Sequence, residues 1–400
     1  MDRASVIVAG AGPAGVVAAY RLAQMGISVL VLEACPECPE DMRASTFHAP
    51  TLEMMSELGI LEELEAQGLR APVYQYRNRQ TGEVLSFDLG EIADATAHPY
   101  RLQCEQFKLT RLLTKRIGEH PNGRVLFNHR VVHYEQDAQG VTVAVETPFA
   151  IERFRCDYLI GADGANSTVR KWMGAQFDGF TYPEKFLTLS TAYPIERSFP
   201  GLANVSYMAD AHEWCVLLRV PSVWRILVPV DNGQSDAELL RDDKKNQVIG
   251  GLIGGDATHV ETEHRTLYKV HQRVASRYYD GRVAIIGDAA HLNNPLGGFG
   301  MNSGVHDAWN LTQRLQSILL DGADAEAELA HFERQRRTIM REFVQAQTIK
   351  NKQEMEDKNS ESQRRRQADF EAILTDSEKR RTYLLNQAMI TSREREALIA

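Results

Sequence analysis

The segment GDAAHLNNPLGGFGMN, residues 287–302, places one carboxylate and a glycine-rich backbone directly after the apolar run RVAII. A carboxylate at the end of a strand can accept hydrogen bonds from a polyhydroxylated chain, and glycines let a flat ring lie against the backbone. In this segment the acceptor is Asp288 and the glycines are Gly297, Gly298 and Gly300. A helix that begins near Met301 and Asn302 would direct the positive end of its dipole to the same place. These residues therefore predict a site for a hydroxylated ligand whose ring becomes negatively charged.

A second glycine-rich turn lies near the start of the chain, between a predicted strand and a predicted helix. Its GxGxxG spacing lets a pyrophosphate approach the backbone N–H groups at the start of the helix. Glu33 ends the next predicted strand, where its carboxylate can accept hydrogen bonds from both ribose hydroxyls of an adenosine. The motif leaves both NAD and FAD open as ligands. The residues expected to contact the dinucleotide are Gly10, Gly12, Pro13, Ala14, Gly15 and Glu33.

Two more strand ends carry an acidic residue. The segment CDYLIGADGANSTVR puts Asp163 at the end of an apolar strand, and RVAIIGDAAH does the same for Asp288. Each by itself is typical of a capped turn from a strand to a helix. Together with GxGxxG, and in this order, they resemble the three fingerprints of the single-component flavoprotein aromatic hydroxylases, the family of p-hydroxybenzoate hydroxylase. The resemblance extends from about Ser5 to Leu315.

The resemblance implies an FAD-dependent monooxygenase that binds FAD tightly but not covalently. In this family NADH or NADPH binds transiently and reduces the flavin, without a second nucleotide-binding domain. Dioxygen then adds to the reduced ring, and the resulting flavin hydroperoxide transfers an oxygen atom to an electron-rich aromatic carbon. The expected partners are therefore a phenolic or heteroaromatic small molecule, dioxygen and NAD(P)H. The protein is expected to exclude water and to hold the aromatic ring within reach.

Three residues take cofactor roles through the resemblance. Pro295 would lie beside the ring edge where dioxygen adds. Arg43, in DMRAST, resembles the mobile-loop arginine that contacts the cofactor, and Gln103, in YRLQCEQ, matches the flavin-contacting glutamine. A surface ion pair for Arg43 and a helix cap for Gln103 remain as alternatives.

The substrate residues are fewer. Tyr207, in NVSYMAD, matches the tyrosine that hydrogen-bonds the phenol and helps it to ionise. Arg219 matches the arginine that holds a substrate carboxylate, but leucines at positions 217 and 296 replace the serine and the threonine expected there. The loss of two hydroxyls favours a larger or more apolar ring than p-hydroxybenzoate. Packing in the core or at the surface is the alternative for each substrate residue. Two further candidates for the pocket are Arg225 and His48.

Other functions could use the same cofactor site. An epoxidase, a reductase or a halogenase would act on a non-phenolic substrate. Flavin halogenases carry a WxWxIP segment, and the nearest match here, WRILVP, has one tryptophan only, which disfavours that branch. A non-enzymatic alternative is a flavin redox sensor whose charged C-terminal helices contact a partner.

The elements that position these residues follow from the apolar periodicity. A strand, a helix and a second strand are predicted within residues 4–33, and further helices at 51–67 and 103–117. The segments VYQYRN and EVLSFDL look like paired strands. From residue 180 to about 277, alternating aromatic and β-branched residues predict a largely antiparallel sheet. Beyond residue 324 the composition is charged and helical.

The predicted fold class is α/β, with a Rossmann-like FAD-binding domain, an inserted mixed or antiparallel β-sheet domain for the substrate, and C-terminal helices. The helices are expected to pack on the FAD-binding domain or to form a homodimer contact. The predicted limits are 1–75, 100–179 and 278–325 for the FAD-binding domain, 76–99 and 180–277 for the substrate domain, and 326–400 for the helical region.

Composition limits the partners. The chain has 400 residues, of which 43% are hydrophobic and 25% charged, as in ordinary globular proteins. Its net charge of -9 argues against nucleic acid or an anionic membrane as a partner. No apolar run is long enough to cross a bilayer, and the first one is broken by glycines, unlike a signal peptide. Five cysteines, an odd number, argue against a disulfide framework, so we expect a cytoplasmic protein.

Three other patterns are better explained by ordinary structure than by a ligand. Cys35 and Cys38 have CxxC spacing, but further zinc ligands are lacking nearby and flanking prolines are atypical of a redox pair, so a solvated turn is favoured. The segment GGLIGGD, residues 250–256, lacks the preceding strand and following helix of a nucleotide site. His291 and His306 have no carboxylate partner at ligand spacing, so we expect no metal site.

Overall fold

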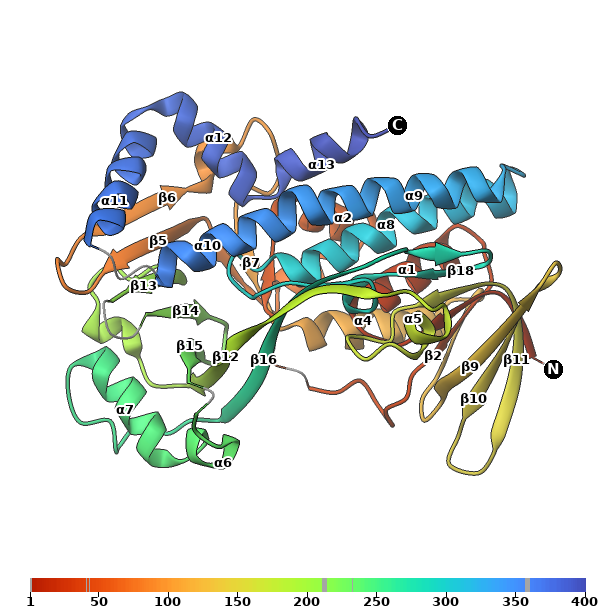
Figure 1. Cartoon of the computed structure of the whole chain (residues 1–400), viewed down its shortest axis with the longest axis horizontal. Helices are drawn as coiled ribbons and strands as arrows, with labels where there is room; N and C mark the ends of the chain where they lie inside the picture. Colours follow the sequence, from red (N-terminus) through yellow and green to blue (C-terminus); the bar gives the residue numbers. More distant parts are fainter. Residues whose placement is uncertain (1, 41, 43, 211–213, 232, 357–359) are drawn as a thin grey trace.

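The computed structural model describes residues 2–40, 42, 44–210, 214–231, 233–356 and 360–400. Figure 1 shows two large sheets toward opposite ends of the molecule, with the C-terminal helices, in blue, along the top. A third sheet is smaller and has three strands.

The first large sheet has the N-terminal strand near its centre. Its strands are β1 (Asp2–Ala9), β2 (Val29–Leu32), β8 (Gly123–Leu126), β9 (Arg130–Asp137), β10 (Gly140–Glu146), β11 (Ile151–Gly161), β17 (Tyr279–Asp280) and β18 (Val283–Ile285). The order β18-β11-β1-β2-β8 is parallel throughout, while β17 and the β9–β10 hairpin add antiparallel neighbours. Val6, Ile7 and Val8 of β1 are fully buried, as expected for a central parallel strand.

Helices connect and cover this sheet. Helix α1 packs against α8 and α4, and β1, α1 and β2 form the predicted strand–helix–strand unit. The predicted α/β class is therefore confirmed. The helices are α1 (Pro13–Gln24), α4 (Gln106–Glu119), α5 (Thr168–Trp172) and α8 (Phe299–Leu320).

Two predicted helices have other limits. The helix predicted at 51–67 is two helices, α2 (Ala49–Glu57) and α3 (Leu61–Glu65), because Gly59 between them has a φ of +71° that ends the first one. The helix predicted at 103–117 begins only at Gln106. Gln103 instead ends strand β7 (Arg101–Gln103), which pairs with β3 (Thr46–Phe47) and β4 (Leu69–Ala71) in the small sheet.

The second large sheet is mainly antiparallel, as predicted. Its strands follow the order β19-β16-β12-β15-β14-β13-β5-β6, in which only the β13–β5 pair, among the described residues, is parallel. The domain boundary predicted between residues 75 and 76 falls inside the continuous strand β5. The strands are β5 (Val73–Asn78), β6 (Val84–Asp88), β12 (Phe177–Thr191), β13 (Val205–Ala209), β14 (Cys215–Arg219), β15 (Trp224–Val230), β16 (His264–Ala275) and β19 (His291–Leu292).

The two faces of this sheet pack against different partners, because successive side chains of a strand alternate. What we call the inner face carries Tyr207, Val216 and Leu227, which share an apolar cluster with Leu296. What we call the outer face carries residues such as Leu217, Trp224 and Ile226 and packs on α6 (Asp236–Leu239) and α7 (Asp242–Ile253). Short 3-10 turns are η1 (Leu89–Ile92), η2 (Ile195–Ser198) and η3 (Gly287–Ala289).

The C-terminal part is helical. Figure 1 shows α9 and α10 as one long rod beside α8, with α11 and α12 folded near β5 and β6. Phe370 and Leu384 of α11 and α12 belong to the apolar cluster of the inner face. None of the helices in the described ranges is long and apolar enough to cross a membrane. The elements are α9 (Ala325–Ile339), the π-helical η4 (Met340–Gln345), α10 (Ala346–Glu356), α11 (Ser360–Thr375), α12 (Ser377–Gln387) and α13 (Ile390–Ala397).

Candidate functional site

The GxGxxG turn joins β1 to α1, and its three glycines have three different reasons to be glycine. Gly10 has a φ of +101°, and a Cβ there would lie 2.4 Å from the Ala162 carbonyl oxygen. A Cβ on Gly15 would lie 2.2 Å from the carbonyl oxygen of Gly10. Gly12 differs, because its φ is ordinary and a Cβ there would have no protein atom within 4 Å. The space beside Gly12 is therefore left open for a ligand at the start of α1.

Glu33 follows β2 and faces the same turn. Its Oε2 accepts a hydrogen bond of 2.7 Å from the Ala11 N–H, and its Oε1 accepts one of 2.9 Å from the Cys35 N–H. Each carboxylate oxygen can accept a further bond. Glu33 is thus held rigidly and can still accept ribose hydroxyls.

Two cavities meet at this turn. The first, of about 300 Å³, lies beside Glu33 and is lined by Gly10, Gly12, Pro13 and Asp163 among others. The second, of about 360 Å³, extends to the glycine-rich segment after β18. The two share lining residues, so they adjoin each other at the turn that carries Gly12. The shared residues are Gly12, Pro13, Gln106, Ala162 and Gly164.

The segment 287–302, which we call the flavin loop, forms one wall of the second cavity. The exposed side chain of Asp288 lies in η3 at the cavity. Gly297 and Gly298 have φ values of +104° and +72°, which favour glycine, and Gly298 is the N-cap of α8. Helix α8 therefore begins two residues earlier than expected, at Phe299. Predicted residues that line this cavity are Gly12, Pro13, Ala14, Asp288, Pro295, Gly298, Gly300 and Met301.

Asn302 does not line the cavity. Its side chain is fully buried and its Nδ2 donates to the carbonyl oxygens of Thr46 and Gly298, at 2.8 and 2.7 Å. Its Oδ1 accepts from the His48 N–H at 2.9 Å. The side chain thus ties the flavin loop to α2 and β3, and contact with a cofactor is left to the helix N–H groups.

His48 acts on the same loop. Its ring Nε2 lies 2.7 Å from the Gly297 carbonyl oxygen, which can only accept, so Nε2 carries the proton and donates. Burial lowers the pKa of His48 to about 3, helped by the nearby charge of Arg101 and opposed by the bond to Gly297. His48 is therefore neutral and positions the loop. His48 was predicted to line the substrate pocket, but it is not among the residues that line the cavity.

Asp163 caps a helix. Its Oδ2 accepts from the N–H groups of Thr168 and Val169 at 2.7 and 3.1 Å, and its Oδ1 from the Ser167 hydroxyl at 2.5 Å. Arg170 then donates 2.9 Å to the Ala289 carbonyl oxygen, which links this turn to the flavin loop. Asp163 thus lines the first cavity, but both its carboxylate oxygens hold the start of helix α5 in place.

Gln103 and Arg43 have different outcomes. Gln103 is fully buried, and its Oε1 accepts from the Thr46 hydroxyl at 3.1 Å, while its Nε2 has no partner. Since Thr46 lines the second cavity, Gln103 lies just behind the wall, with one donor left over. Arg43 lies outside the described residues.

The inner face of the second sheet forms the opposite wall. Leu218, Leu227, Tyr268 and Val270 line the cavity there. Tyr207 lies on this face, paired with Val216, which is in turn paired with Leu227.

Arg225 lies on the inner face as well. It is buried, and its Nη1 donates 2.9 Å to the Ser45 hydroxyl at the edge of the cavity. Arg225 thus contacts a residue of the cavity wall, and its predicted role in the pocket stays a prediction.

Arg219 lies on the other side. It follows Leu218 in β14 and so points to the outer face, where its guanidinium lies 5.6 Å from the Trp224 ring centroid. Leu217 belongs to the outer-face cluster too. The expected carboxylate clamp therefore does not face the cavity, because alternation along the strand presents Val216 and Leu218 there instead.

Sequence reasoning missed a buried arginine. Arg101 is 1% exposed, lies 4.2 Å from the Tyr74 ring centroid and interacts with Tyr207. Burial disfavours its charge, but Tyr207, Tyr74 and Tyr76 together keep the pKa of Arg101 above its ordinary value. The signal was its place two residues before Gln103, on the same side of one strand. Other missed cavity residues are Ser45, Thr46, Gln106 and Asn293.

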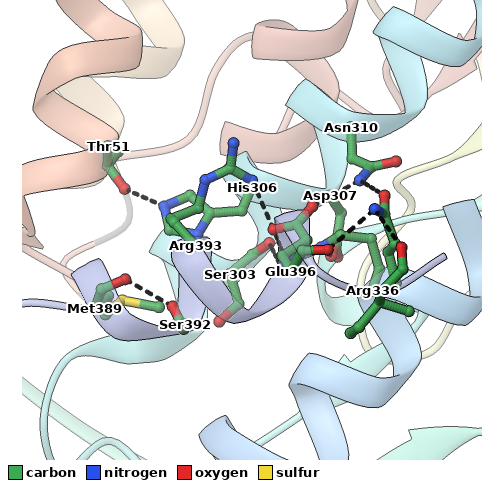
Figure 2. A network of polar contacts seen from close by, with 12 residues as sticks. Thr51, Ser303, His306, Asp307, Asn310, Arg336, Met389, Ser392, Arg393 and Glu396 are labelled. Atoms are coloured by element: carbon green, nitrogen blue, oxygen red, sulfur yellow. Dashed lines mark hydrogen bonds and ion pairs between the residues drawn. The ribbon is translucent and has the colours of Figure 1, made fainter. Parts of the chain in front are cut away.

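A charged network backs the flavin loop (Figure 2). Asp307 of α8 accepts from the Arg336 Nε at 2.7 Å, and Arg336 Nη1 donates to Glu396 at 2.7 Å. Asp307 also accepts from the Gly287 N–H at 3.0 Å, one residue before Asp288. The network thus connects α13, through α9 and α8, to the turn that presents Asp288.

His291 belongs to this network, which corrects the expectation that it has no carboxylate partner. Its Nε2 lies 2.6 Å from Asp307, and both side chains are 1% exposed. His306, by contrast, lies 3.1 Å from the Thr51 hydroxyl, and burial holds its pKa well below the ordinary value. Within the described ranges, no group of three or more His, Cys, Asp or Glu side chains is arranged for a metal ion.

The α10 side of the C-terminal rod supports the same loop. Gln345 donates 2.9 Å to the Leu292 carbonyl oxygen, and Asn294 donates 2.9 Å to that of Thr348. Asn351 donates 3.3 Å to the carbonyl oxygen of Leu296. The C-terminal helices therefore pack against the flavin loop itself.

The remaining patterns have structural explanations. Cys38 is buried, with its Sγ 3.3 Å from the Thr114 hydroxyl. Burial, followed by the nearby Glu33 carboxylate, raises the pKa of Cys35, opposite to a reactive thiol. Residues 250–253 end helix α7, and Gly254 caps it with a φ of +76°, so this segment is a helix end.

Comparisons with known proteins agree with this geometry. The family model described as FAD binding domain matches residues 3–347. The para-nitrophenol 4-monooxygenase of Pseudomonas sp. (strain WBC-3) is 31% identical over 97% of this chain and 96% of its own length. The 6-hydroxy-3-succinoylpyridine 3-monooxygenase of Pseudomonas putida (strain DSM 28022 / S16) is 33% identical over 85% of this chain and 86% of its own.

A solved structure agrees in fold along nearly the whole chain. The crystal structure of p-nitrophenol 4-monooxygenase from Pseudomonas putida DLL-E4 superimposes with a TM-score of 0.92 at 28% identity, covering 97% of this chain and 99% of that one. Two adjoining cavities and a GxGxxG turn are consistent with the matching family model. The chain therefore belongs to the FAD-binding-domain family of flavin-dependent aromatic monooxygenases.

Proposed function

We propose that this monooxygenase holds FAD along the two adjoining cavities and hydroxylates a single-ring phenol bound between the flavin loop and the inner face. The observation that carries the proposal is the pair of adjoining cavities, one beside Glu33 and one beside Pro295, which share Gly12. Its two halves suit the two halves of a dinucleotide.

The residues present fit FAD. The open space at Gly12 accommodates a pyrophosphate, which a side chain would fill. Glu33 would hold the ribose and Asp288 the polyhydroxylated chain. The first N–H groups of α8 lack intrahelical acceptors and would hold a negative charge on the ring.

When bound and reduced by NADH or NADPH, FAD supplies the oxygen-activating chemistry that protein side chains lack. The protein's own residues orient and shield. Pro295 and the flavin loop define one side of the reaction space, and apolar side chains of the inner face, Leu218, Leu227 and Val270, exclude water from the other. The proposed role of Tyr207 is to hydrogen-bond the substrate hydroxyl.

The relatives support a single-ring substrate. By their names, they act on p-nitrophenol and on 6-hydroxy-3-succinoylpyridine, each a single aromatic ring with a hydroxyl group. We therefore expect phenols and hydroxypyridines to accelerate NAD(P)H consumption by the FAD-loaded protein, with a hydroxylated product. A folded, FAD-loaded protein that shows no acceleration with any of these compounds would contradict the proposal.

A matched pair of glycine variants tests the cofactor path. Gly12 and Gly118 both have open space around an added Cβ, but only Gly12 lines the cavities. We expect Gly12→Val to weaken FAD binding by about 100-fold, since its side chain occupies the pyrophosphate position, and Gly118→Val to leave it unchanged. Titration of the apoprotein with FAD measures both. Equal FAD affinities in the two variants would contradict the proposed position of the pyrophosphate beside Gly12.

The cellular setting is also a proposal. Five free cysteines, of which only Cys35 is partly exposed, suit a reducing cytoplasm. A homodimer contact through the C-terminal helices remains a prediction, which light scattering of the purified protein tests.

A further inference from the structure

The buried guanidinium of Arg101 lacks a balancing charge. Its Nε and Nη2 have no hydrogen-bond partner, although the residue is 1% exposed. Within the part of the chain that the structure describes, no carboxylate forms an ion pair with it. A buried cation left in this state is costly, and proteins normally pair such groups. The missing anion is therefore expected from outside the chain.

The groups that face Arg101 are polar but neutral. Tyr74 of β5 stacks on it at 4.2 Å, and Tyr207 of β13 interacts with it. Tyr76 of β5 stacks on Tyr207 with ring centroids 4.8 Å apart. His48, the residue before α2, is uncharged, because burial and the charge of Arg101 lower its pKa to about 3. These rings form an aromatic cup around a single positive charge.

Two strands place this cup close to the second cavity, behind the residues that line it. Along β7, Arg101 lies on the same side as Gln103, which bonds the cavity residue Thr46. Across the inner face, Tyr207 lies two strands from the cavity residue Leu227, or about 10 Å.

The flavin loop reaches the same place. Leu296, the neighbour of Pro295, packs in one cluster with Tyr74 and Tyr207. Leu296 therefore links the cavity wall at Pro295 to the residues that surround Arg101.

We propose that Arg101 and Tyr207 form an oxyanion pocket that binds the ionised hydroxyl of a phenolic substrate. The inference rests on the proposed function. One oxygen can accept both from the Tyr207 hydroxyl and from the unpartnered donors of Arg101. A phenolate spreads its charge into the ring, so an aromatic cup desolvates it at lower cost than a carboxylate.

The pocket also serves the reaction. A positive charge within about 4–6 Å lowers the pKa of an acid by about 1–3 units, so the pocket favours the ionised phenol. Ionisation makes the ring carbons ortho and para to the oxygen more nucleophilic. Arg101 thereby selects substrates that can ionise and activates them in one contact.

The test compares p-nitrophenol with its methyl ether, 4-nitroanisole, which cannot ionise. Both are titrated into FAD-loaded wild type, Arg101→Met and Arg101→Lys, and the absorbance of bound p-nitrophenol reports its ionisation at each pH. We expect Arg101→Met to weaken p-nitrophenol binding by at least about tenfold and to raise its bound pKa by about one unit or more, with 4-nitroanisole affinity within about twofold. Arg101→Lys is expected to restore part of both effects.

A matched control is Arg70→Met on the neighbouring strand β4, where the side chain is 62% exposed. It is expected to leave both ligands unaffected. Equal loss of both ligands in Arg101→Met would assign Arg101 a structural role and overturn the pocket, as would an unchanged bound pKa. A folded wild type that accelerates NAD(P)H consumption with other phenols but does not bind p-nitrophenol also overturns the pocket alone. If no phenol has any effect, the proposed function falls with it.

Discussion

Arg101 and Arg336 are equally buried, each 1% exposed, yet their surroundings differ. Arg336 lies between two carboxylates, Asp307 and Glu396, and also donates to the Ser303 carbonyl oxygen. Arg101 lies among tyrosine rings and has two nitrogen atoms without partners. Figure 2 shows Arg336 beside Asp307 and Glu396, the two carboxylates that balance its charge.

The contrast separates two uses of a buried charge. The chain itself balances Arg336, so this residue holds α8, α9 and α13 together behind the flavin loop. The chain does not balance Arg101, so its charge is available to a ligand. Removal of the positive charge should therefore lower the stability of the protein at Arg336 and leave it unchanged or raise it at Arg101.

The largest effect is expected for Arg336→Met. It leaves Asp307 and Glu396 buried without their shared cation, which should lower the free energy of unfolding by about 3–5 kcal/mol. Urea unfolding measures the loss. Arg337→Met, one residue along on a 26% exposed side chain, is the control and should cost at most about 1 kcal/mol. Similar values for both variants would show that the network contributes little.

A smaller effect is expected for Glu396→Gln, which keeps the shape but removes one carboxylate. Its hydrogen bonds to Arg336 and Asn310 weaken, at a cost of about 1.5–3 kcal/mol. Urea unfolding of this variant, with the exposed Glu394→Gln as control, checks the value.

The same variant has a pH signature. Burial alone would raise the pKa of Glu396, but Arg336 and Arg393 lower it below 4.5 in the folded state. Burial would likewise raise the pKa of Asp307, but His291 and Arg336 lower it below 3.8. The unfolded chain therefore takes up protons first as the pH falls, so this stability is complete above about pH 4.5 and is lost below it. As the pH falls through this range, the free energy of unfolding should decrease less steeply in Glu396→Gln than in wild type. Parallel curves for variant and wild type would rule out the linkage.

Removing the charge at Arg101 should barely change stability. Arg101→Met replaces an unbalanced buried cation with an apolar side chain of similar length, so the free energy of unfolding should stay within about 1 kcal/mol of wild type or increase. The same urea experiment decides. If Arg101→Met lowered the free energy of unfolding as much as Arg336→Met, both arginines would have the same structural role and the proposed difference would be wrong.

The smallest expected effect is on His48. Arg101 is the second cause, after burial, of its pKa of about 3, so Arg101→Met should raise that pKa while burial keeps it below 6.5. NMR titration of histidine-labelled protein measures it. His271 is the control, because burial, Arg273 and Lys269 lower its pKa and Arg101 does not. An unmoved His48 titration would place Arg101 too far away to act on it.

The positions of the predicted cofactor residues beside the two cavities could be anticipated from the sequence because their geometry is local, and their contact with the cofactor stays a prediction. Gly10, Gly12 and Gly15 act within one turn, and Glu33 follows the next strand. Asp288 was found in the same way, as the end of a strand. Such positions depend on a few neighbouring residues, so spacing alone predicts them.

The substrate half depends on register and distant partners. A shift of one residue moves a side chain to the other face of a strand, which is why Arg219 was assigned to the cavity and faces away from it. Gln103 was placed in a helix because local periodicity does not show its pairing with β3.

Buried charge is equally hidden in the sequence. Nothing near Asp307 in the chain indicates that Arg336 and Glu396 balance it. The isolation of Arg101 becomes visible only when every neighbour is in place.

The π-helical turn Met340–Gln345 lies where the long rod passes the flavin loop, and its last residue holds the Leu292 carbonyl oxygen. A π-turn carries one residue more than an α-turn, so a one-residue deletion there that restores regular helix leaves the total rotation of the segment nearly unchanged. Thr348 and Asn351 would then still face the loop, whereas a one-residue deletion in regular helix just before Thr348 would turn them away by about 100°. The π-turn thus accommodates an extra residue without turning α10 away from the loop that it supports.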